Sequence, residues 1–369
     1  MNNPPPLDGF FDFDYAGERL SDLDTPVPVI DIDVVARNLA RWQQRCDALG
    51  LANRPHIKTH KLIGLAKYQL ALGAKGITVQ KLGEAEVMAG AGIKDMLLTF
   101  NVLGDKKVER LGTLIRQTTI AVVADNAEML PGLAAAAQKG GRKLDILVEC
   151  DTGMGRNGVQ STDAALTLAR AINANAELTF KGLMTYPKGG TRIETSQFLA
   201  RAREQLHSAG LDCPVISSGG TPDMWSDEGL AGITEYRAGT YAYFDRSLVE
   251  RGACSMEECA LTVLTTVVSR PTGNRAMIDA GTKSLTSDML GMQGFGIVPA
   301  LACAKVYDAS EEHGFVDVAS QAEKPHIGAR LRVLPNHVCP VSNLFDKVVF
   351  VRGEKVLGSV NVDARGCVT

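Results

Sequence analysis

Short apolar runs alternate with longer amphipathic stretches between residues 50 and 245 of this 369-residue chain. Eight runs rich in β-branched and other apolar residues are predicted strands, over 54–59, 76–80, 95–100, 119–124, 144–150, 179–185, 215–218 and 235–238. The stretches between them, such as 81–91 and 163–174, place apolar residues near helical spacing. Eight strands alternating with helices over about 200 residues predict a (β/α)8 TIM barrel. An open doubly wound sheet is the alternative.

The pattern changes after residue 245, where helical spacing becomes rare. Strand-like runs follow one another over 259–269, 274–278, 302–307, 330–334, 347–351 and 356–362, with Gly, Pro and Asp/Asn turns between them. Such a series indicates an antiparallel β-domain. We therefore expect an α/β protein with a barrel domain over 25–250 and a C-terminal antiparallel β-domain over 251–369, which residues 1–24 join.

Composition excludes several classes of partner. A content of 45% apolar and 22% charged residues is ordinary for a soluble globular protein. The net charge of −3 gives no basic footprint for nucleic acid, and no apolar run approaches the roughly 18 residues of a membrane span. The N-terminal residues lack the pattern of a signal peptide, and the eight cysteines form no CxxC pair. These features predict a cytoplasmic protein with reduced thiols and with no nucleic-acid or membrane partner.

Polar residues gather where the first predicted strand ends. His56, Lys58, Thr59, His60 and Lys61 lie within six positions. Groups of this kind are costly to bury without partners. In a TIM barrel the active site lies at the carboxyl ends of the strands, so this segment is a candidate site. A solvated loop with a cationic bias is the alternative for this segment taken alone.

Two small-residue runs follow the seventh and eighth predicted strands, Ser-Ser-Gly-Gly-Thr over 217–221 and Arg-Ala-Gly-Thr-Tyr over 237–241. Glycine permits close backbone approach, and free N–H groups with hydroxyls can cradle a phosphate. TIM barrels often bind phosphate with the loops after these two strands. Together with Lys58, the runs suggest pyridoxal phosphate, held by the lysine as a Schiff base.

A GxGxxG match over 153–158 resembles a dinucleotide-binding fingerprint. It follows the fifth predicted strand instead of opening the fold, and only a weak helical pattern comes after it. We therefore disfavour nicotinamide or flavin binding, and we interpret Arg156 as a cation at the barrel mouth that faces the cofactor.

His337 and Cys339 are separated by one residue in a segment predicted to be extended. Residues i and i+2 of a strand face the same side, so the two side chains could bind one ion. Imidazole with thiolate suits zinc, although other divalent ions such as manganese remain open. An ordinary strand with a buried cysteine and a hydrogen-bonded histidine is the alternative.

These segments resemble the D-threonine aldolase and D-serine dehydratase family. The residues that carry the resemblance are PHIKTHK at 55–61, GI at 76–77, QKLGEA at 80–85, DTGMGR at 151–156, SGGT at 218–221, AGTY at 238–241, DAGTKS at 279–284 and HVC at 337–339. They occur in order along nearly the whole chain. Such a series is more specific for the family than for one activity within it.

The resemblance implies an alanine-racemase-like barrel with a β-domain, assembled as a homodimer. It implies that Lys58 carries pyridoxal phosphate and that His337 and Cys339 bind the divalent metal. The implied cofactor contacts are Lys58, His56, Gln80, Arg156, Tyr186, Ser218, Gly219, Gly220, Thr221, Gly239, Thr240 and Tyr241.

The resemblance also implies a lyase that acts on a D-3-hydroxy amino acid. We expect D-threonine aldolase activity, which yields glycine and an aldehyde, with Lys58 and His60 as the catalytic residues. The alternative is a D-serine or D-threo-3-hydroxyaspartate dehydratase, an ammonia-lyase. The aldolases of the family have aspartate where this chain has Cys339, whereas the dehydratases have cysteine. A racemase and a non-catalytic pyridoxal phosphate carrier are further alternatives.

Overall fold

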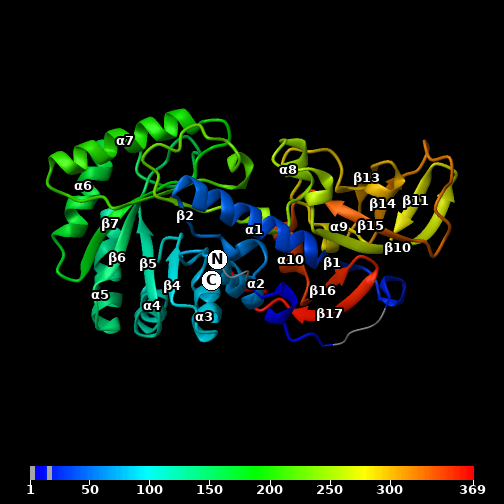
Figure 1. The fold of residues 1–369 in the computed structure, drawn as a ribbon, viewed down its shortest axis with the longest axis horizontal. Coiled ribbons are helices and arrows are strands. Elements are labelled where there is room, and N and C mark those ends of the chain that lie inside the picture. Colours follow the sequence, from blue (N-terminus) through cyan, green and yellow to red (C-terminus); the bar gives the residue numbers. More distant parts are fainter. Residues whose placement is uncertain (1–4, 15–18) are drawn as a thin grey trace. The chain divides into compact units, whose positions relative to one another are not determined.

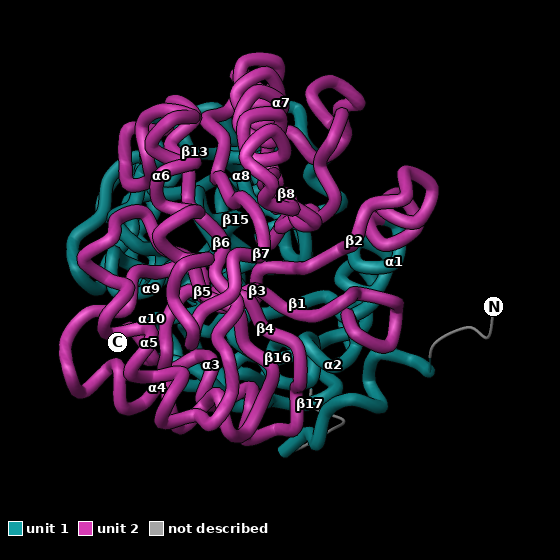
Figure 2. The backbone as a smooth tube through the Cα atoms, turned by 90° about the vertical axis from the view of Figure 1, so that its left-hand side faces the viewer, with its two compact units in different colours: residues 1–41, 59–68, 240–366 teal, residues 42–58, 69–239, 367–369 magenta. Residues whose placement is uncertain are grey.

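The computed structural model describes residues 5–14 and 19–369. Contacts between Cα atoms divide the chain into two compact units (Figure 2). Unit 1 comprises residues 1–41, 59–68 and 240–366, and unit 2 comprises 42–58, 69–239 and 367–369. The chain therefore passes between the units several times, and the units are described one at a time below.

Unit 2 contains the barrel. Its eight strands are β2 (Ala52–Asn53), β3 (Ile77–Val79), β4 (Asp95–Leu98), β5 (Thr119–Ala124), β6 (Leu144–Glu149), β7 (Leu178–Met184), β8 (Val215–Ser218) and β9 (Glu235–Tyr236). They form one parallel sheet in the order β2-β9-β8-β7-β6-β5-β4-β3. A parallel bridge between His56 and Thr78 joins the segment after β2 to β3, so the sheet closes on itself. The predicted (β/α)8 barrel is confirmed.

Helices cover the outside of these strands. Those lying wholly in unit 2 are α3 (Leu82–Gly90), α4 (Asp105–Gln117), α5 (Leu130–Gly140), α6 (Thr162–Asn173) and α7 (Arg192–Ser208). Figure 1 shows α3, α4 and α5 in a row along β4, β5 and β6. In α6 the buried residues Ala165, Leu168, Ala169 and Ile172 recur at helical spacing, which gives the helix one apolar face.

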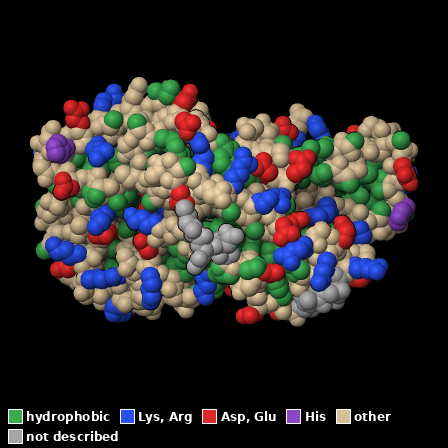
Figure 3. Space-filling model, viewed as in Figure 1, with side chains coloured by type: hydrophobic (Ala, Val, Ile, Leu, Met, Phe, Trp, Pro, Cys, Tyr) green, Lys and Arg blue, Asp and Glu red, His purple; other side chains and the backbone are tan. Residues whose placement is uncertain are grey.

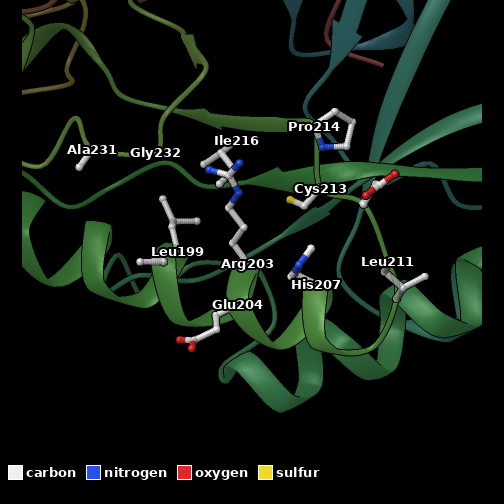
Figure 4. A pocket seen from close by; sticks show the side chains of 12 residues that line it. Leu199, Arg203, Glu204, His207, Leu211, Cys213, Pro214, Ile216, Ala231 and Gly232 are labelled. Carbon is white, nitrogen blue, oxygen red and sulfur yellow. The ribbon is translucent and has the colours of Figure 1, made fainter.

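One helix of the ideal barrel is replaced. The chain between β8 and β9 forms only a 3-10 turn (Thr221–Asp223) and a loop, with no α-helix among these described residues. A groove of about 680 Å³ lies beside α7, between that helix and the chain around β8 (Figure 4). Leu199, Arg203 and His207 from α7 line one wall of the groove.

Unit 1 contains a nine-stranded sheet in the order β11-β14-β13-β12-β15-β10-β1-β16-β17. Its strands are β1 (Val27–Asp31), β10 (Leu261–Thr272), β11 (Arg275–Ile278), β12 (Gly296–Val298), β13 (Ala304–Ala309), β14 (Gly314–Asp317), β15 (Arg330–Pro335), β16 (Lys347–Arg352) and β17 (Lys355–Asn361). β1 pairs antiparallel with β10 and parallel with β16. The other pairings in this sheet are antiparallel.

Further helices are α1 (Ile32–Leu49), α2 (Ile63–Leu72), α8 (Arg246–Glu250), α9 (Thr282–Leu285) and α10 (Val338–Leu344). Residues 337–339 were predicted to be extended, and this is wrong for the second and third of them. His337 has φ −141° and ψ 108°, but α10 begins at the next residue. Pro340 lies in the first turn of α10, where a missing N–H group is tolerated.

Within each unit, Figure 3 shows basic and acidic side chains interspersed over the face that is drawn. No helix in the described part of the chain is long and apolar enough to cross a membrane.

Candidate active site

Lys58 lies at the carboxyl end of β2, in a 3-10 turn (Ile57–Thr59). Its backbone N–H donates to His56 Nδ1 at 3.4 Å. His56 Nε2 lies 3.1 Å from Gln80 Oε1, and Gln80 Nε2 donates to the carbonyl oxygen of Thr99 at 2.8 Å. The structure thus brings together two predicted cofactor contacts, His56 and Gln80, beside the backbone of the predicted anchor lysine.

The two predicted phosphate loops meet within unit 2. The N–H group of Gly239 donates to Thr221 Oγ1 at 3.3 Å, which joins the loop after β9 to the loop after β8. Gly219 has φ +96°, and a Cβ added there would lie 2.3 Å from the Tyr236 ring. The Tyr236 hydroxyl donates to the carbonyl oxygen of Gly220 at 3.0 Å. Only glycine therefore fits at position 219.

Backbone donors are available in this cradle. Among the described residues, the N–H groups of Gly219 and Gly220 make no hydrogen bond to another backbone group. A Cβ added at Gly220 would lie 3.0 Å from the Tyr186 ring, so Tyr186 closes one side of the loop. Two adjacent free N–H groups beside a hydroxyl form a concave donor site for an anion such as a phosphate group.

Arg156 and Glu149 form a second polar group in unit 2. Arg156 Nη2 lies 3.7 Å from Glu149 Oε1, and its guanidinium carbon lies 5.5 Å from the centre of the Tyr186 ring. Burial raises the pKa of Glu149 to about 7, against the opposing charges of Arg156 and Arg237. The other carboxylate oxygen, Oε2, is buried and has no hydrogen-bond partner among the described residues.

Arg237 lies in a run that the sequence indicated, but its own role was not predicted. Its side chain is buried, and it donates to Ser217 Oγ at 2.7 Å and to the Thr185 carbonyl oxygen at 2.6 Å. Burial lowers the pKa of Arg237 to about 10, so it stays charged near neutral pH. Strand alternation is the signal that could have placed this side chain inside the barrel.

His337 and Cys339 belong to unit 1. Cys339 Sγ lies 3.1 Å from Thr59 Oγ1 and 3.6 Å from Thr240 Oγ1. Burial acts to lower the pKa of His337, but its hydrogen bonds and charge interactions with Cys339 and Asp288 outweigh burial and raise the pKa to about 9. The two predicted metal ligands are therefore neighbours, although the first turn of a helix brings them together instead of a strand.

His60 is buried in the same unit, and its ring packs edge-on against Tyr243, with centroids 6.5 Å apart. His60 Nδ1 accepts a hydrogen bond from the Leu62 N–H at 3.0 Å. The neutral ring must then carry its proton on Nε2. The Tyr243 hydroxyl is buried and finds no partner in the described part of the chain.

The remaining predicted contacts divide between the units. Ser218 ends β8 in unit 2, whereas Thr240 and the buried Tyr241 belong to unit 1. The sequence did not indicate Asp288, Tyr243 or Asp245. Asp245 is buried and accepts hydrogen bonds from the N–H groups of Val338 and Leu248.

Two family profiles match the chain in succession. The alanine racemase N-terminal domain matches residues 30–247, and a putative serine dehydratase domain matches residues 260–351. The chain is 36% identical to a D-threonine aldolase from an Arthrobacter species, over 95% of each chain. It is 34% identical to a D-threo-3-hydroxyaspartate dehydratase from a Delftia species, over 89% of this chain and 94% of that one.

Solved structures agree with this relationship. The D-threonine aldolase of Filomicrobium marinum superposes with a TM-score of 0.89 at 30% identity, over 96% of this chain and 99% of that one. The Delftia dehydratase superposes with a TM-score of 0.84 at 31% identity, over 93% and 99%. The alanine racemase of Bacillus anthracis, at 15% identity and a TM-score of 0.69, shares the fold over 92% and 98%.

The fold is therefore the alanine-racemase-like fold of pyridoxal phosphate-dependent proteins. The chain belongs to the D-threonine aldolase and D-serine dehydratase family within that class.

Proposed function

We propose that this protein is a pyridoxal phosphate- and divalent metal-dependent lyase that cleaves D-3-hydroxy amino acids by a retro-aldol reaction, as a D-threonine aldolase does. The observation that carries the proposal is the pair of joined glycine loops in the barrel that also bears Lys58 at a strand end. Aldolase relatives at 36% identity and a TM-score of 0.89 support this choice of activity.

The residues of unit 2 fit pyridoxal phosphate. The Lys58 amine would hold the cofactor covalently, and the N–H groups of Gly219 and Gly220 would bind its phosphate. We assign Arg156 and Tyr186, which lie beside each other, to contacts with the cofactor ring. When bound, pyridoxal phosphate withdraws electrons from the Cα atom of an attached amino acid and so weakens the bonds at that atom.

The donor set of His337 and Cys339 fits a zinc ion, with manganese as the alternative. Such an ion would polarise the 3-hydroxyl group of the substrate. One solved variant of a D-threo-3-hydroxyaspartate dehydratase replaces a histidine by alanine, and another, solved in the metal-free form, replaces a cysteine two positions later by alanine. The same spacing separates His337 and Cys339.

His60 has a restricted role under this proposal. Because Nδ1 accepts from the Leu62 N–H, the neutral ring can donate a hydrogen bond through Nε2 but cannot accept a proton there. We therefore assign His60 to orienting an oxygen atom by donation. Another group must accept the proton of the substrate hydroxyl in the aldolase reaction.

A dehydratase is the second candidate, and Cys339 is the observation that favours it. Cysteine at this position matches the dehydratases of the family and not the aldolases. In that reaction the Lys58 amine would remove the Cα proton, and ammonia would be released with an oxo acid.

Product analysis separates the two activities. The purified holoenzyme would be incubated with D-threonine, D-phenylserine, D-serine and D-3-hydroxyaspartate, with the L-isomers as controls. We expect glycine and an aldehyde without ammonia. Ammonia together with pyruvate or oxaloacetate would instead establish the dehydratase, and a lack of turnover on every substrate would contradict both.

Replacement of Lys58 by alanine tests the cofactor assignment. We expect the Lys58→Ala protein to lose the visible absorption band of lysine-bound pyridoxal phosphate and to lose turnover. Lys61→Ala is the matched control, because this second lysine of the motif donates to the Ala364 carbonyl oxygen instead. A Lys58→Ala protein that retains the absorption band would overturn the assignment.

We further propose that the protein is a homodimer that acts in the cytoplasm. The eight cysteines, all of which the structure describes, form no disulfide, which is in keeping with a reducing compartment. Sedimentation of the holoenzyme should give about twice the 39.4 kDa mass of one chain.

A further inference from the structure

Asp288, whose own role the sequence did not indicate, contacts one of the two proposed metal ligands. It lies between α9 and β12, and its Oδ2 is 2.7 Å from His337 Nδ1. We propose that Asp288 is a positioning residue that orients the His337 ring so that Nε2 presents its lone pair to the divalent ion. This inference rests on the metal site of the proposed function.

The hydrogen bond determines which ring nitrogen is available. A carboxylate that binds Nδ1 favours the tautomer with the proton on Nδ1, and this leaves the lone pair on Nε2. Histidine ligands of metals commonly donate their second ring N–H group to a carboxylate in this way. The contact therefore prepares His337 to bind a metal through Nε2.

Asp288 is an outer partner of the site and not a third ligand. Its Oδ2 binds His337, and its Oδ1 accepts from the Leu290 N–H at 3.4 Å. Within the described residues, no three His, Cys, Asp or Glu side chains gather closely enough to hold one ion. The position of Asp288 on the Nδ1 side of the ring agrees with that result.

The loop holds Asp288 at a conformational cost. Thr286 has φ +66° and Leu290 has φ +46°, and both are non-glycine residues in a region that L-residues rarely adopt. The Asp288 N–H donates to Thr286 Oγ1 at 3.1 Å. Strained backbone of this kind is concentrated at functional sites, where the surrounding structure maintains it.

The main chain at His337 is fixed independently of Asp288. Asp245, which is buried, accepts from the Val338 N–H at 3.2 Å and also binds Ser247. Loss of the Asp288 side chain should therefore release the His337 ring while α10 keeps its place. An altered metal affinity would then report the orientation of the ring and not unfolding of the helix.

An exposed ion pair without function is the competing interpretation, because the Asp288 side chain is 43% exposed. Such pairs contribute little to stability. The two interpretations predict the same small change in stability but different changes in metal affinity. Metal affinity is therefore the decisive measurement.

The experiment measures Zn²⁺ affinity by competition with a chromophoric chelator, on the full-length protein loaded with pyridoxal phosphate. The Co²⁺-substituted protein provides a ligand-field spectrum as a second readout. The variants are Asp288→Ala, Asp288→Asn and His337→Ala. Glu312→Ala is the matched control, because it removes an exposed 2.7 Å ion pair with Lys283 in the same unit.

We expect Asp288→Ala to weaken Zn²⁺ binding by about 10- to 100-fold and to change the Co²⁺ spectrum. Asp288→Asn, which keeps an acceptor oxygen but loses the charge, should fall between that variant and the unaltered protein. Glu312→Ala should bind as the unaltered protein does. The cofactor absorption band should be unchanged in all four variants.

The results separate failure of this inference from failure of the metal site. If His337→Ala abolishes binding while both Asp288 variants bind like the unaltered protein, Asp288 has no positioning role and the metal site stands. If His337→Ala binds Zn²⁺ as tightly as the unaltered protein, or if the unaltered protein itself does not bind Zn²⁺, the metal site of the proposed function is wrong and the inference falls with it.

Discussion

Glu149 is a buried residue whose ionisation should make the stability of the protein depend on pH. Its side chain is 2% exposed, one oxygen faces Arg156 and the other has no partner among the described residues. Burial disfavours the charged form of a carboxyl group. Burial therefore raises the pKa of Glu149 from 4.5 to about 7, even though two arginines oppose the shift.

The unfolding free energy should therefore depend on pH through Glu149. A carboxyl group with a higher pKa in the folded state binds protons more tightly when folded, so stability falls as pH rises from about 5 to about 8. Glu149→Gln is neutral throughout and should lose this dependence, a difference of roughly 3 kcal/mol at most. Urea unfolding at both pH values measures it, with the exposed Glu128→Gln as control. Parallel pH curves for Glu149→Gln and the unaltered protein would contradict the assignment.

Residue types and spacing could indicate Lys58, the glycine loops and the pair His337 and Cys339, because each lies in a short segment with a distinctive composition. They could not indicate Asp288, since its contact with His337 joins positions 49 residues apart through an irregular loop. Asp245 and Tyr243 were missed for a related reason. A buried carboxylate and a buried phenol look ordinary in sequence until the fold shows what they face.

Among the elements, the barrel strands were mostly predicted, whereas two short strands of the nine-stranded sheet were not. Seven of the eight predicted barrel strands overlap observed strands, because parallel strands buried on both faces are rich in apolar residues. The predicted strand over 54–59 is wrong, since β2 ends at Asn53 and residues 57–59 form a 3-10 turn. β12 and β14 have only three and four residues and lie among turns, so their periodicity is too short to detect. α10 was mistaken for an extended segment because its seven residues include two valines and a proline.

The loop after β8 offers a test of the phosphate cradle. Gly219→Ala would place a methyl group against the Tyr236 ring in a backbone conformation that alanine disfavours. We expect a loss of more than about 2 kcal/mol in unfolding free energy, together with weaker retention of pyridoxal phosphate.

Gly210→Ala is the matched control for this prediction. Gly210 also has a positive φ, +73°, but a Cβ there meets nothing within 4 Å. It should lose only about 1–2 kcal/mol and keep the cofactor. Thermal unfolding and the pyridoxal phosphate content of the purified proteins measure both effects. Equal cofactor retention in the two variants would argue against a phosphate cradle at Gly219.

In the molecule as a whole, a partly buried network of charged side chains joins separate strands of the barrel near the place where its sheet closes. Arg54, which follows β2, binds Glu235 of β9 and Asp95 of β4, each at 2.6 Å. Glu235 also accepts from Ser217 Oγ, which in turn accepts from Arg237. The network links strands that are far apart in sequence, so no local pattern could have predicted it.

Arg54→Met should destabilise the protein by about 3–5 kcal/mol, because it leaves the Glu235 carboxylate buried without its cation. Arg365→Met is the control, since it removes only an exposed ion pair with Asp346 and should cost less than about 1 kcal/mol. The midpoint of urea unfolding distinguishes the two variants. Similar midpoints would contradict this prediction. They would mean that the hydrogen bond from Ser217 is enough to stabilise the buried Glu235 carboxylate.

The central place of β1 in the nine-stranded sheet has a consequence for synthesis of the protein. β1 ends at Asp31, but its partner β10 begins about 230 residues later and β16 later still. At a ribosomal rate of roughly 5–20 residues per second, the apolar strand waits on the order of 10–50 s before either neighbour exists. Folding of unit 1 is thus largely a post-translational event. Until it occurs, both edges of β1 are open to chaperones and to incorrect pairing.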